Sequence, residues 1–460
     1  MGMGRRRALA HSGSWRNWTG DQECHPAEIL RPGNRDELVA GIAAAAGAGR
    51  TVSVAGSGHS FTGAALTDGT LIDIGALNGV IEADRSSGLV KVGAGTVLAD
   101  LNEELHRLGL AMENLGDIDR QTVAGAICTG THGTGAKLRN LSAQVEAIEL
   151  ITAEGDVREL GTLAGNGGGS ANAHATQAQP GGELDLVRAA RVSIGALGAI
   201  SAVTLRCVPA FTLKRVDTPV SREEVFDTFQ ERADANDHFE LFTFPYADSA
   251  LVLERNRSEA PPRPRGRAAA YLNDIVLENW ALEAFSAAGK LLPFAIPSLS
   301  RLAARLASGG RTIDRSDHAF ANERRVRFTE MEYGVPREHG PAAAREVIEW
   351  VRANRYPVFF PIEMRVTAAD DALLSPSFER DTTYIAVHQY RGMEWRPYFE
   401  AVEGIMNRFD GRPHWGKRHF QTAATLAPRY PAWARFQAVR DELDPGRAFT
   451  NEYASVVLGS

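Results

Sequence analysis

The sequence predicts an α+β protein with two domains, and three observations support this prediction. The chain has 460 residues, which is more than a single hydrophobic core usually organises. Short β runs alternate with amphipathic helices up to Pro209, and a second series of helices and β runs begins after it. We therefore expect a first domain over residues 16–210, a second over 211–460, and a flexible N-terminus over 1–15.

The expected helices follow from their end signals and from the spacing of their apolar residues. The segment 34–47 opens with a capping asparagine, carries glutamate three residues later and ends in glycine. The segment 96–109 places four leucines along one face and also ends in glycine. In the second domain, Ser221 and Glu224 match a capping box, so we expect a helix to open at Ser221.

Composition excludes several classes of protein. The net charge of −7 gives no support for a nucleic-acid binder. Three cysteines at unrelated spacings indicate neither a disulfide framework nor a metal site, and they favour a reducing, cytoplasmic location. No apolar run reaches the roughly 18 residues of a membrane span. The run 290–299, "KLLPFAIPSL", is short and broken by two prolines; it favours a core segment and leaves a peripheral membrane contact open. The Gly/Ala/Ser/Asn-rich segment 161–182 is predicted to be a mobile insertion.

Two glycine-rich loops mark the first domain. One is "AGSGHSFTG" at 55–63, after a β run, and the other is "GDIDRQTVAGAICTGTHGTGA" at 116–136. Glycine has no Cβ, so backbone N–H groups of such loops approach a phosphate closely. Two loops in one domain favour a long, phosphate-bearing ligand, while two plain turns of a β-rich domain remain the alternative.

The first loop also resembles a nicotinamide dinucleotide site, because Gly-x-Gly follows a strand and Asp73 lies downstream. However, the third glycine, Gly63, falls at the wrong spacing. Asp73 then ends the very next β run, with no crossover helix between the two. We therefore reject this interpretation.

At the level of motifs, the chain resembles the FAD-dependent sugar-1,4-lactone oxidases, a family that includes gulonolactone and arabinonolactone oxidases and is related to alditol oxidase. The resemblance covers roughly residues 14–459 apart from 161–182. It implies an FAD-binding domain of the vanillyl-alcohol-oxidase (PCMH) type and a mixed α+β cap domain, with a C-terminal segment that returns to the flavin. The motifs that carry it are "GSGHSF" (56–61), "GDIDRQTVAGAICTGTHGTG" (116–135), "RVSIGALGAIS" (191–201), "RPHWGKRHFQ" (412–421) and "LDPGRAFTNEY" (443–453).

By this resemblance both glycine loops hold FAD, and His59 matches the histidine that bonds the flavin covalently; a purely hydrogen-bonding His59 is the alternative. Gly116 matches a position where oxygen-reactive relatives have glycine and a plant dehydrogenase has alanine, although the actinobacterial dehydrogenase type also keeps glycine. The expected FAD-binding residues are Val54, Ala55, Gly56, Ser57, Gly58, His59, Ser60, Gly116, Thr122, Gly125, Ala126, Thr129, Gly130, His132, Gly133, Thr134, Gly135 and Ile200.

Polar residues of the second domain are candidates for substrate chemistry. Period-2 spacing puts Glu363 and Arg365 on one face of a β run, and His388 and Tyr390 on one face of another. Such faces could line a pocket for a polyhydroxylated ligand or could be solvated outer faces. The motif around Lys417 adds a cation that, by resemblance, stabilises the reduced flavin. We expect Glu363 and Arg365 to orient substrate, His388 to act as base, and Tyr390 and His414 to contact substrate. No metal is expected.

The resemblance implies oxidation of a secondary alcohol in a sugar-1,4-lactone, with hydride transfer to FAD and reoxidation by oxygen or another acceptor. The alternatives are an alditol or polyol oxidase, a biosynthetic flavoenzyme acting on a sugar conjugate, and a flavin-free sugar-binding or structural protein.

Overall fold

The computed structural model describes residues 13–161, 182–263, 282–306, 309–321 and 326–460. Residues 1–12 and nearly all of the predicted insertion lie outside the described residues. Trp15, which the sequence prediction places in a flexible N-terminus, instead pairs with Cys24 in a two-stranded sheet of β1 (Trp15–Arg16) and β2 (Glu23–Cys24).

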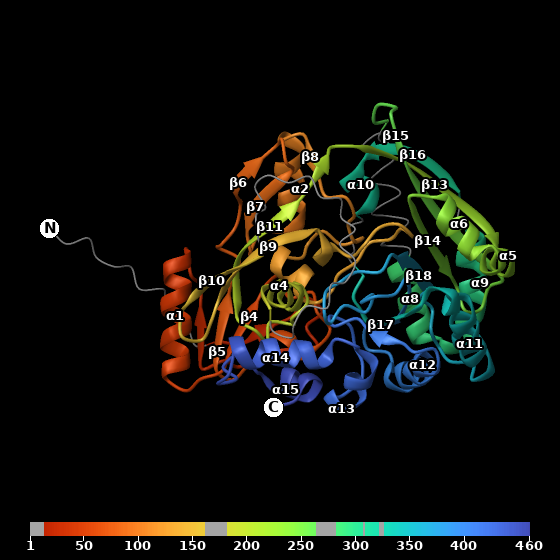
Figure 1. Ribbon diagram of the computed structural model, residues 1–460. Coiled ribbons are helices and arrows are strands. Elements are labelled where there is room, and N and C mark those ends of the chain that lie inside the picture. The colour runs from red at the N-terminus through yellow and green to blue at the C-terminus, as the bar shows by residue number, and fades with distance from the viewer. Residues whose placement is uncertain (1–12, 162–181, 264–281, 307–308, 322–325) are drawn as a thin grey trace.

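The first part of the chain forms a small parallel sheet and a larger antiparallel one (Figure 1). The parallel sheet has the order β3-β5-β4, and its members are β3 (Glu28–Leu30), β4 (Val52–Ala55) and β5 (Thr70–Asp73). The antiparallel sheet has the order β10-β9-β11-β7-β6, and its members are β6 (Val80–Asp84), β7 (Leu89–Gly93), β9 (Val145–Ile151), β10 (Val157–Leu160) and β11 (Ala199–Arg206). The helices are α1 (Arg35–Gly47), α2 (Leu98–Arg107), α3 (Val123–Cys128) and α4 (Glu183–Arg191). A short pair of β8 (Leu110–Ala111) and β12 (Val208–Pro209) ends this part.

The chain joins a different sheet at β13, close to residue 210, where the sequence predicts a domain boundary. This eight-stranded antiparallel sheet has the order β16-β13-β15-β14-β18-β19-β17-β20. Its strands are β13 (Thr212–Ser221), β14 (His238–Thr243), β15 (Ser249–Ser258), β16 (Gly310–Arg315), β17 (Phe328–Pro336), β18 (Ile362–Thr367), β19 (Thr382–Tyr390) and β20 (Arg412–Pro413). The accompanying helices are α5 (Arg222–Asp227), α6 (Phe229–Ala235), α8 (Leu282–Leu291), α9 (Ile296–Leu306), α10 (Ser316–Phe320), α11 (Gly340–Ala353) and α12 (Arg396–Arg408).

The last three helices return to the first part of the molecule, in blue in Figure 1. They are α13 (Ala423–Leu426), α14 (Trp433–Leu443) and α15 (Glu452–Leu458). Their buried residues, including Phe436 and Leu458, share one hydrophobic core with α1, α2 and the five-stranded sheet. A second core lies between the eight-stranded sheet and the helices α5, α6, α11 and α12. The other face of the eight-stranded sheet therefore carries the polar side chains that point toward the first part of the molecule.

The helix ends test the capping predictions. Asn34 caps α1 as expected, because its side chain accepts a hydrogen bond from the Glu37 N–H at 2.9 Å. The prediction of a capping box at Ser221 is wrong. Ser221 stands at the N-cap of α5 without a side-chain bond, and the Glu224 carboxylate pairs with Arg232 instead.

The alternation of apolar residues from 357 to 366 predicts one long β run that carries Glu363 and Arg365. In the structure this strand, β18, begins only at Ile362. Pro361 directly precedes the strand, and proline has no N–H to donate to a β ladder. All residues of β18 and β19 are buried, so the interpretation of their polar faces as solvated surfaces is excluded.

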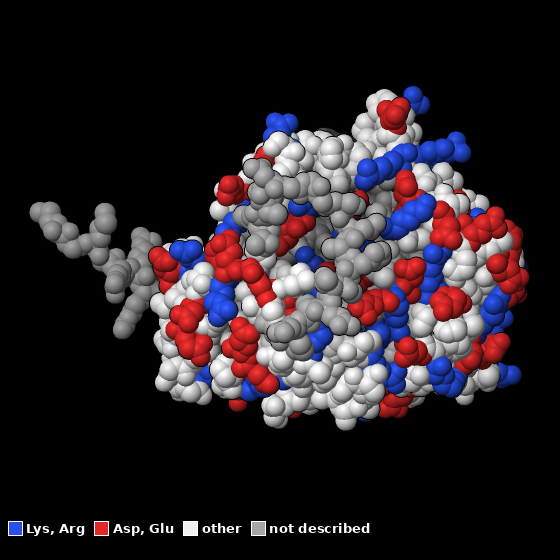
Figure 2. Space-filling model, in the orientation of Figure 1, with Lys and Arg blue, Asp and Glu red and all other residues white. Residues whose placement is uncertain are grey.

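Two further observations concern the surface. Within the described part of the chain, we find no helix long and apolar enough to cross a lipid bilayer. On the face shown in Figure 2, acidic and basic side chains are interspersed, in keeping with the modest net charge of −7.

Candidate active site

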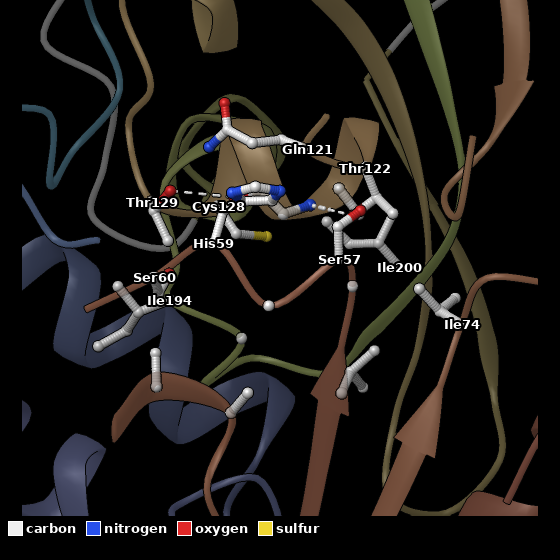
Figure 3. A pocket seen from close by; sticks show the side chains of 18 of the residues that line it. Ser57, His59, Ser60, Ile74, Gln121, Thr122, Cys128, Thr129, Ile194 and Ile200 are labelled. Carbon is white, nitrogen blue, oxygen red and sulfur yellow. Dashed lines mark hydrogen bonds between the residues drawn. The ribbon is translucent and has the colours of Figure 1, made fainter. Parts of the chain in front are cut away.

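A cleft with about 840 Å³ of empty space, its open mouth included, lies against the two glycine loops, and we call it the glycine cleft (Figure 3). Of the residues expected to bind FAD, ten line it: Val54, Gly56, Ser57, Gly58, His59, Ser60, Thr122, Gly125, Thr129 and Ile200. Further lining residues that the sequence analysis did not single out include Trp15, Thr62, Ile74, Gln121, Cys128, Ile194, Gly195 and Gly198.

The two loops contact one another, which explains their glycines. A Cβ on Gly56 would lie 2.2 Å from Thr122 Oγ1, so no larger residue fits there. Gly58 has a positive φ of 70°, in the left-handed region that glycine adopts without strain. Thr122 in turn caps α3, because its hydroxyl oxygen accepts from the Gly125 N–H at 3.2 Å. The β4 loop and the start of α3 therefore form one wall of the cleft.

A second cleft of about 580 Å³ continues from the first, and we call it the charged cleft. Both clefts are lined by His59, Ser60, Gln121 and Thr129, so they meet at these residues. The other residues of the charged cleft are Trp18, Phe61, Gly116, Asp117, Ile118, Thr131, His132, Glu332, Arg365, His414, Gly416 and Lys417.

His59 lies at the junction of the two clefts and stacks on Trp18, with 5.5 Å between the ring centroids. Burial, followed by the positive charges of Lys417 and Arg120, lowers the pKa of His59 to about 4. The imidazole is therefore neutral near pH 7, which leaves a nitrogen lone pair available for bonding.

The segment around Lys417 is held against the His59 loop by backbone hydrogen bonds. The Phe61 N–H donates to the Gly416 carbonyl at 2.8 Å, and the Thr62 hydroxyl donates to the Trp415 carbonyl at 3.2 Å. Trp415 itself is fully buried in the first hydrophobic core. This anchoring brings Lys417 and His59 to the same cleft although 357 positions separate them in the sequence.

Lys417 forms a buried ion pair with Glu330 of β17, with 2.5 Å between Nζ and Oε2. Burial opposes the charge of the lysine, but Glu330 and Glu332 outweigh it and raise the pKa of Lys417. Burial likewise disfavours the charge of Glu330, yet Lys417 and His388 lower its pKa to about 2. Lys417 is therefore a fixed cation at the wall of the charged cleft.

Arg365 is a second fixed cation, surrounded by carboxylates. It pairs with Glu240 at 2.9 Å, with Asp117 at 3.2 Å, and with Glu363 two residues before it on β18. Desolvation is outweighed by these carboxylates, Asp117 first, so the pKa of Arg365 rises well above its ordinary value. Asp117 comes from the loop at 116–136, so this ion pair links the two parts of the molecule.

His132, Glu332 and His414 come together at the wall of the charged cleft. The two ring nitrogens of His132 face the Gly133 carbonyl at 2.9 Å and Glu332 Oε1 at 3.0 Å. Burial lowers the pKa of His414 to about 3, and its Nδ1 accepts from the Gly416 N–H, which leaves the proton on Nε2. These three groups could hold a metal ion by geometry, but Lys417 and Arg365 line the same cleft and repel a cation.

The structure places three predicted substrate-side residues off both clefts. His388 lies behind Glu330, with 3.4 Å between Nε2 and Oε1, and packs between Phe328 and Phe360. Glu363 forms an ion pair with Arg365 but does not itself line either cleft. The Tyr390 hydroxyl donates a hydrogen bond to Glu283 at 2.5 Å.

Several predicted cofactor residues also lie off the clefts and have packing contacts instead. A Cβ on Gly133 would lie 2.1 Å from Asn114 Oδ1, and one on Gly135 would lie 2.5 Å from the Asp237 carbonyl. Thr134 donates to the Phe239 carbonyl of β14. The residues in this group are Ala55, Ala126, Gly130, Gly133, Thr134 and Gly135.

Sequence reasoning missed the acidic side chains that fix the two cations, namely Asp117, Glu240, Glu330 and Glu332. A signal was present for two of them. Glu330 and Glu332 alternate with Thr329, Met331 and Tyr333 in the β run "RFTEMEY", which puts both carboxylates on one strand face.

The residues present fit an FAD molecule. The glycine cleft is bounded by a loop in which Gly56 leaves no room for a Cβ, and its lining carries no charged side chain, since His59 is neutral near pH 7. It opens at His59 into a cleft with fixed positive charge, where a flavin ring and a substrate can meet. The glycine cleft is therefore the candidate site for FAD.

Comparisons with known proteins agree with this geometry. Residues 26–161 match the FAD binding domain family, and residues 203–457 match the D-arabinono-1,4-lactone oxidase family. The chain is 47% identical over 445 residues to L-gulono-1,4-lactone dehydrogenase of Mycobacterium tuberculosis, covering 97% of this chain and 99% of that protein. It is 33% identical over 451 residues to L-gulonolactone oxidase of Bos taurus, covering 96% and 98%.

Among solved structures, cholesterol oxidase from B. sterolicum superposes with a TM-score of 0.78 at 16% identity, covering 98% of this chain and 97% of that one. This likeness establishes the fold, and together with the FAD binding domain match over residues 26–161 it confirms the expected vanillyl-alcohol-oxidase type. Because the lactone-oxidase match spans more than half of the sequence and its relatives align over nearly the whole length, the chain belongs to the D-arabinono-1,4-lactone oxidase family of FAD-dependent oxidoreductases.

Proposed function

We propose that this enzyme oxidises a secondary hydroxyl of an aldono-1,4-lactone, with L-gulono-1,4-lactone and D-arabinono-1,4-lactone as the first candidates. The names of its relatives suggest these substrates. The observation that carries the proposal is the charged cleft, in which Lys417 and Arg365 present fixed cations beside His59. Such a wall suits a neutral, oxygen-rich ligand whose hydroxyl and lactone oxygens accept hydrogen bonds.

The residues of the glycine cleft would hold FAD, which would supply an acceptor for the hydride of the carbinol carbon and a route for its electrons to a further acceptor. The chain contributes position and charge. Lys417 and Arg365 orient the substrate oxygens, and His414 offers an Nε2–H donor. Glu363 supports Arg365 from behind. Lys417 also stabilises negative charge that develops on the flavin ring, because its own charge is fixed by Glu330.

A base must accept the hydroxyl proton, and we propose His388 for this role, acting through its neighbours. His388 contacts Glu330, and Glu330 contacts Lys417, which lines the charged cleft. The Nε2 atom of His388 faces Glu330, and its Nδ1 atom is buried without a hydrogen-bond partner among the described residues, so His388 would act on the cleft only through the Glu330 carboxylate.

We also propose that His59 bonds the flavin covalently: a ring nitrogen would bond to the 8α carbon, a proton would leave that carbon, and the two electrons would pass to the flavin and from it to the electron acceptor. Its neutral imidazole lies at the junction of the two clefts, where the flavin ring would reach it. The remaining cofactor residues off the clefts would act by holding the loops in place. Oxygen or another electron acceptor would complete the turnover. We further propose a reducing, cytoplasmic location, since Cys24, Cys128 and Cys207 form no disulfide.

The test is a substrate screen of the purified, FAD-loaded enzyme with the two lactones and with alditols. Alditols belong in the screen because an alditol oxidase of Streptomyces sp. is 30% identical over 457 residues. Each substrate is assayed with a dye acceptor and with oxygen in parallel. Reduction of the flavin by a lactone and not by alditols supports the proposal. Turnover of alditols alone would contradict it.

A further inference from the structure

Two helices of the second domain, α8 and α9, form a hairpin whose tip is exposed and apolar. Three large side chains follow one another at the tip, and Leu291 and Phe294 are 80% and 81% exposed. Helices α8 and α9 pack on each other, since a Cβ on Gly289 would lie 2.9 Å from an Ile296 methylene carbon. The third tip residue, Leu292, is 50% exposed.

The apolar surface continues along α9. Its buried line toward the protein consists of Ile296, Ser300 and Ala304, spaced four residues apart. Leu302 and Leu306 lie on a different line, also four apart, and are 46% and 63% exposed. Single exposed leucines need no explanation, but a tip and a helix stripe of five large apolar residues form a patch of the kind that marks an interaction site.

Basic residues accompany this patch in the sequence, and the hairpin carries no acidic residue after Glu283. Lys290 stands next to the tip, and Arg301 and Arg305 lie beside the two leucines on α9. The sequence from Ala284 to Ile313 contains no aspartate or glutamate, although the whole chain carries a net charge of −7. Local positive charge on an acidic protein complements a negatively charged partner.

We propose that the α8–α9 hairpin docks this enzyme on an anionic lipid surface. Apolar side chains at the tip would enter the boundary of headgroups and acyl chains, while Arg301 and Arg305 would pair with lipid phosphates. An amphipathic helix with basic residues beside its apolar stripe is suited to lie in that boundary without spanning the bilayer. A second copy of this chain is disfavoured as occupant, because the basic residues of two equivalent patches would repel each other.

Docking there would place the active site near the membrane. Glu283 of α8 accepts from the Tyr390 hydroxyl at the end of β19, the strand that carries His388. Phe285 of α8 stacks on Phe359, with 5.6 Å between the ring centroids. The hairpin is therefore attached to the sheet that forms the wall of the charged cleft.

The experiment is co-sedimentation of the FAD-loaded enzyme with vesicles. Vesicles of phosphatidylglycerol and phosphatidylcholine are compared with vesicles of phosphatidylcholine alone. We expect binding to the anionic vesicles, weakened when salt rises from roughly 0.1 M to roughly 1 M. The double variant Leu291→Asp/Phe294→Asp should bind at least about tenfold more weakly, because it loses the apolar tip. Arg301→Glu/Arg305→Glu should reduce the preference for anionic lipid by roughly fivefold per charge.

Ile81→Asp is the matched control. Ile81 is 60% exposed, and it lies on β6 of the first domain, far from the hairpin in the sequence. It should bind like the parent. All variants should retain flavin content and turnover, since none of these residues lines either cleft. The proposal is overturned if the parent stays in the supernatant with anionic vesicles, or if the tip variant sediments like the parent. It is also overturned if the tip substitutions abolish a dimer in analytical ultracentrifugation while vesicle binding is absent.

Discussion

Lys417 and Glu330 form a buried ion pair between the charged cleft and the eight-stranded sheet, and His388 contacts the same carboxylate from the other side. The lysine comes from the returning C-terminal segment, and the two partners come from β17 and β19, which pair with Glu330 directly opposite His388. The three side chains thus connect a cation at the cleft with a buried histidine behind it.

Lys417→Ala should slow flavin reduction by roughly a hundred- to thousand-fold, because one preorganised charge contact in the transition state is lost. Lys417→Arg keeps the charge but changes its shape, so it should recover only part of the rate. The measurement is the anaerobic reduction rate with FAD occupancy determined alongside. Lys137→Ala, at an exposed lysine outside both clefts, is the control. A rate within about threefold of the parent at full occupancy would remove Lys417 from the mechanism.

His59→Ala should abolish covalent attachment of the flavin while leaving the fold intact. The parent protein should stay yellow after acid precipitation and fluoresce on a denaturing gel, because its neutral imidazole has bonded the ring. The variant should release its FAD into the supernatant. Free flavin in the supernatant of the parent protein would show that His59 only packs and hydrogen-bonds.

Gly116→Ala should slow reoxidation by oxygen and leave reduction by substrate nearly unchanged. Gly116 lines the charged cleft, and an added Cβ would lie 3.3 Å from the His132 carbonyl, so the methyl group fits tightly and narrows the space. Stopped-flow reoxidation of both proteins by oxygen and by a dye separates the two effects. If the parent reacts with oxygen no faster than free reduced flavin does, Gly116 has no part in acceptor choice.

His388→Gln should slow flavin reduction by about a hundredfold, at the lower end of what a general base supplies, because His388 acts through Glu330. The pH dependence of the reduction rate should flatten at the same time. His318→Gln, at a half-exposed histidine outside both clefts, is the control. A loss below about threefold with an unchanged pH profile would mean that His388 only fills space between Phe328 and Phe360.

The Glu330 carboxylate should make stability depend on pH in the acid range. Its pKa is lowered in the folded protein, from 4.5 to about 2, so its contribution is present above 4.5 and is lost as pH falls toward 2. Glu330→Gln has a lower thermal midpoint near neutral pH, because Lys417 loses its partner, but the difference from the parent should shrink with acidification. Thermal unfolding of both proteins between these pH values measures the difference. If the thermal midpoints of the two proteins differed by the same amount at every pH, the Glu330 carboxylate would not be ionised in the native state.

Local sequence determined the glycine loops, the Asn34 helix cap and the place of His59 within the first glycine loop. These features depend on neighbours within a few residues, because φ angles, caps and close backbone approach are local properties. The family motifs in the sequence also predicted the cofactor, FAD, and the reaction, oxidation of a sugar lactone.

Only the tertiary structure decided which carboxylates hold Lys417 and Arg365. Period-2 spacing shows which side chains of β17, β18 and β19 share a face, but not what that face meets. A buried charge is stable only with a partner, and apart from Glu363 on the same strand the partners here lie on other strands or on the other domain, as Glu240 and Asp117 do for Arg365. Strand order and register, which bring Glu330 opposite His388, and the return of the C-terminal segment, which brings Lys417 to Glu330, arise from long-range packing that no local pattern encodes.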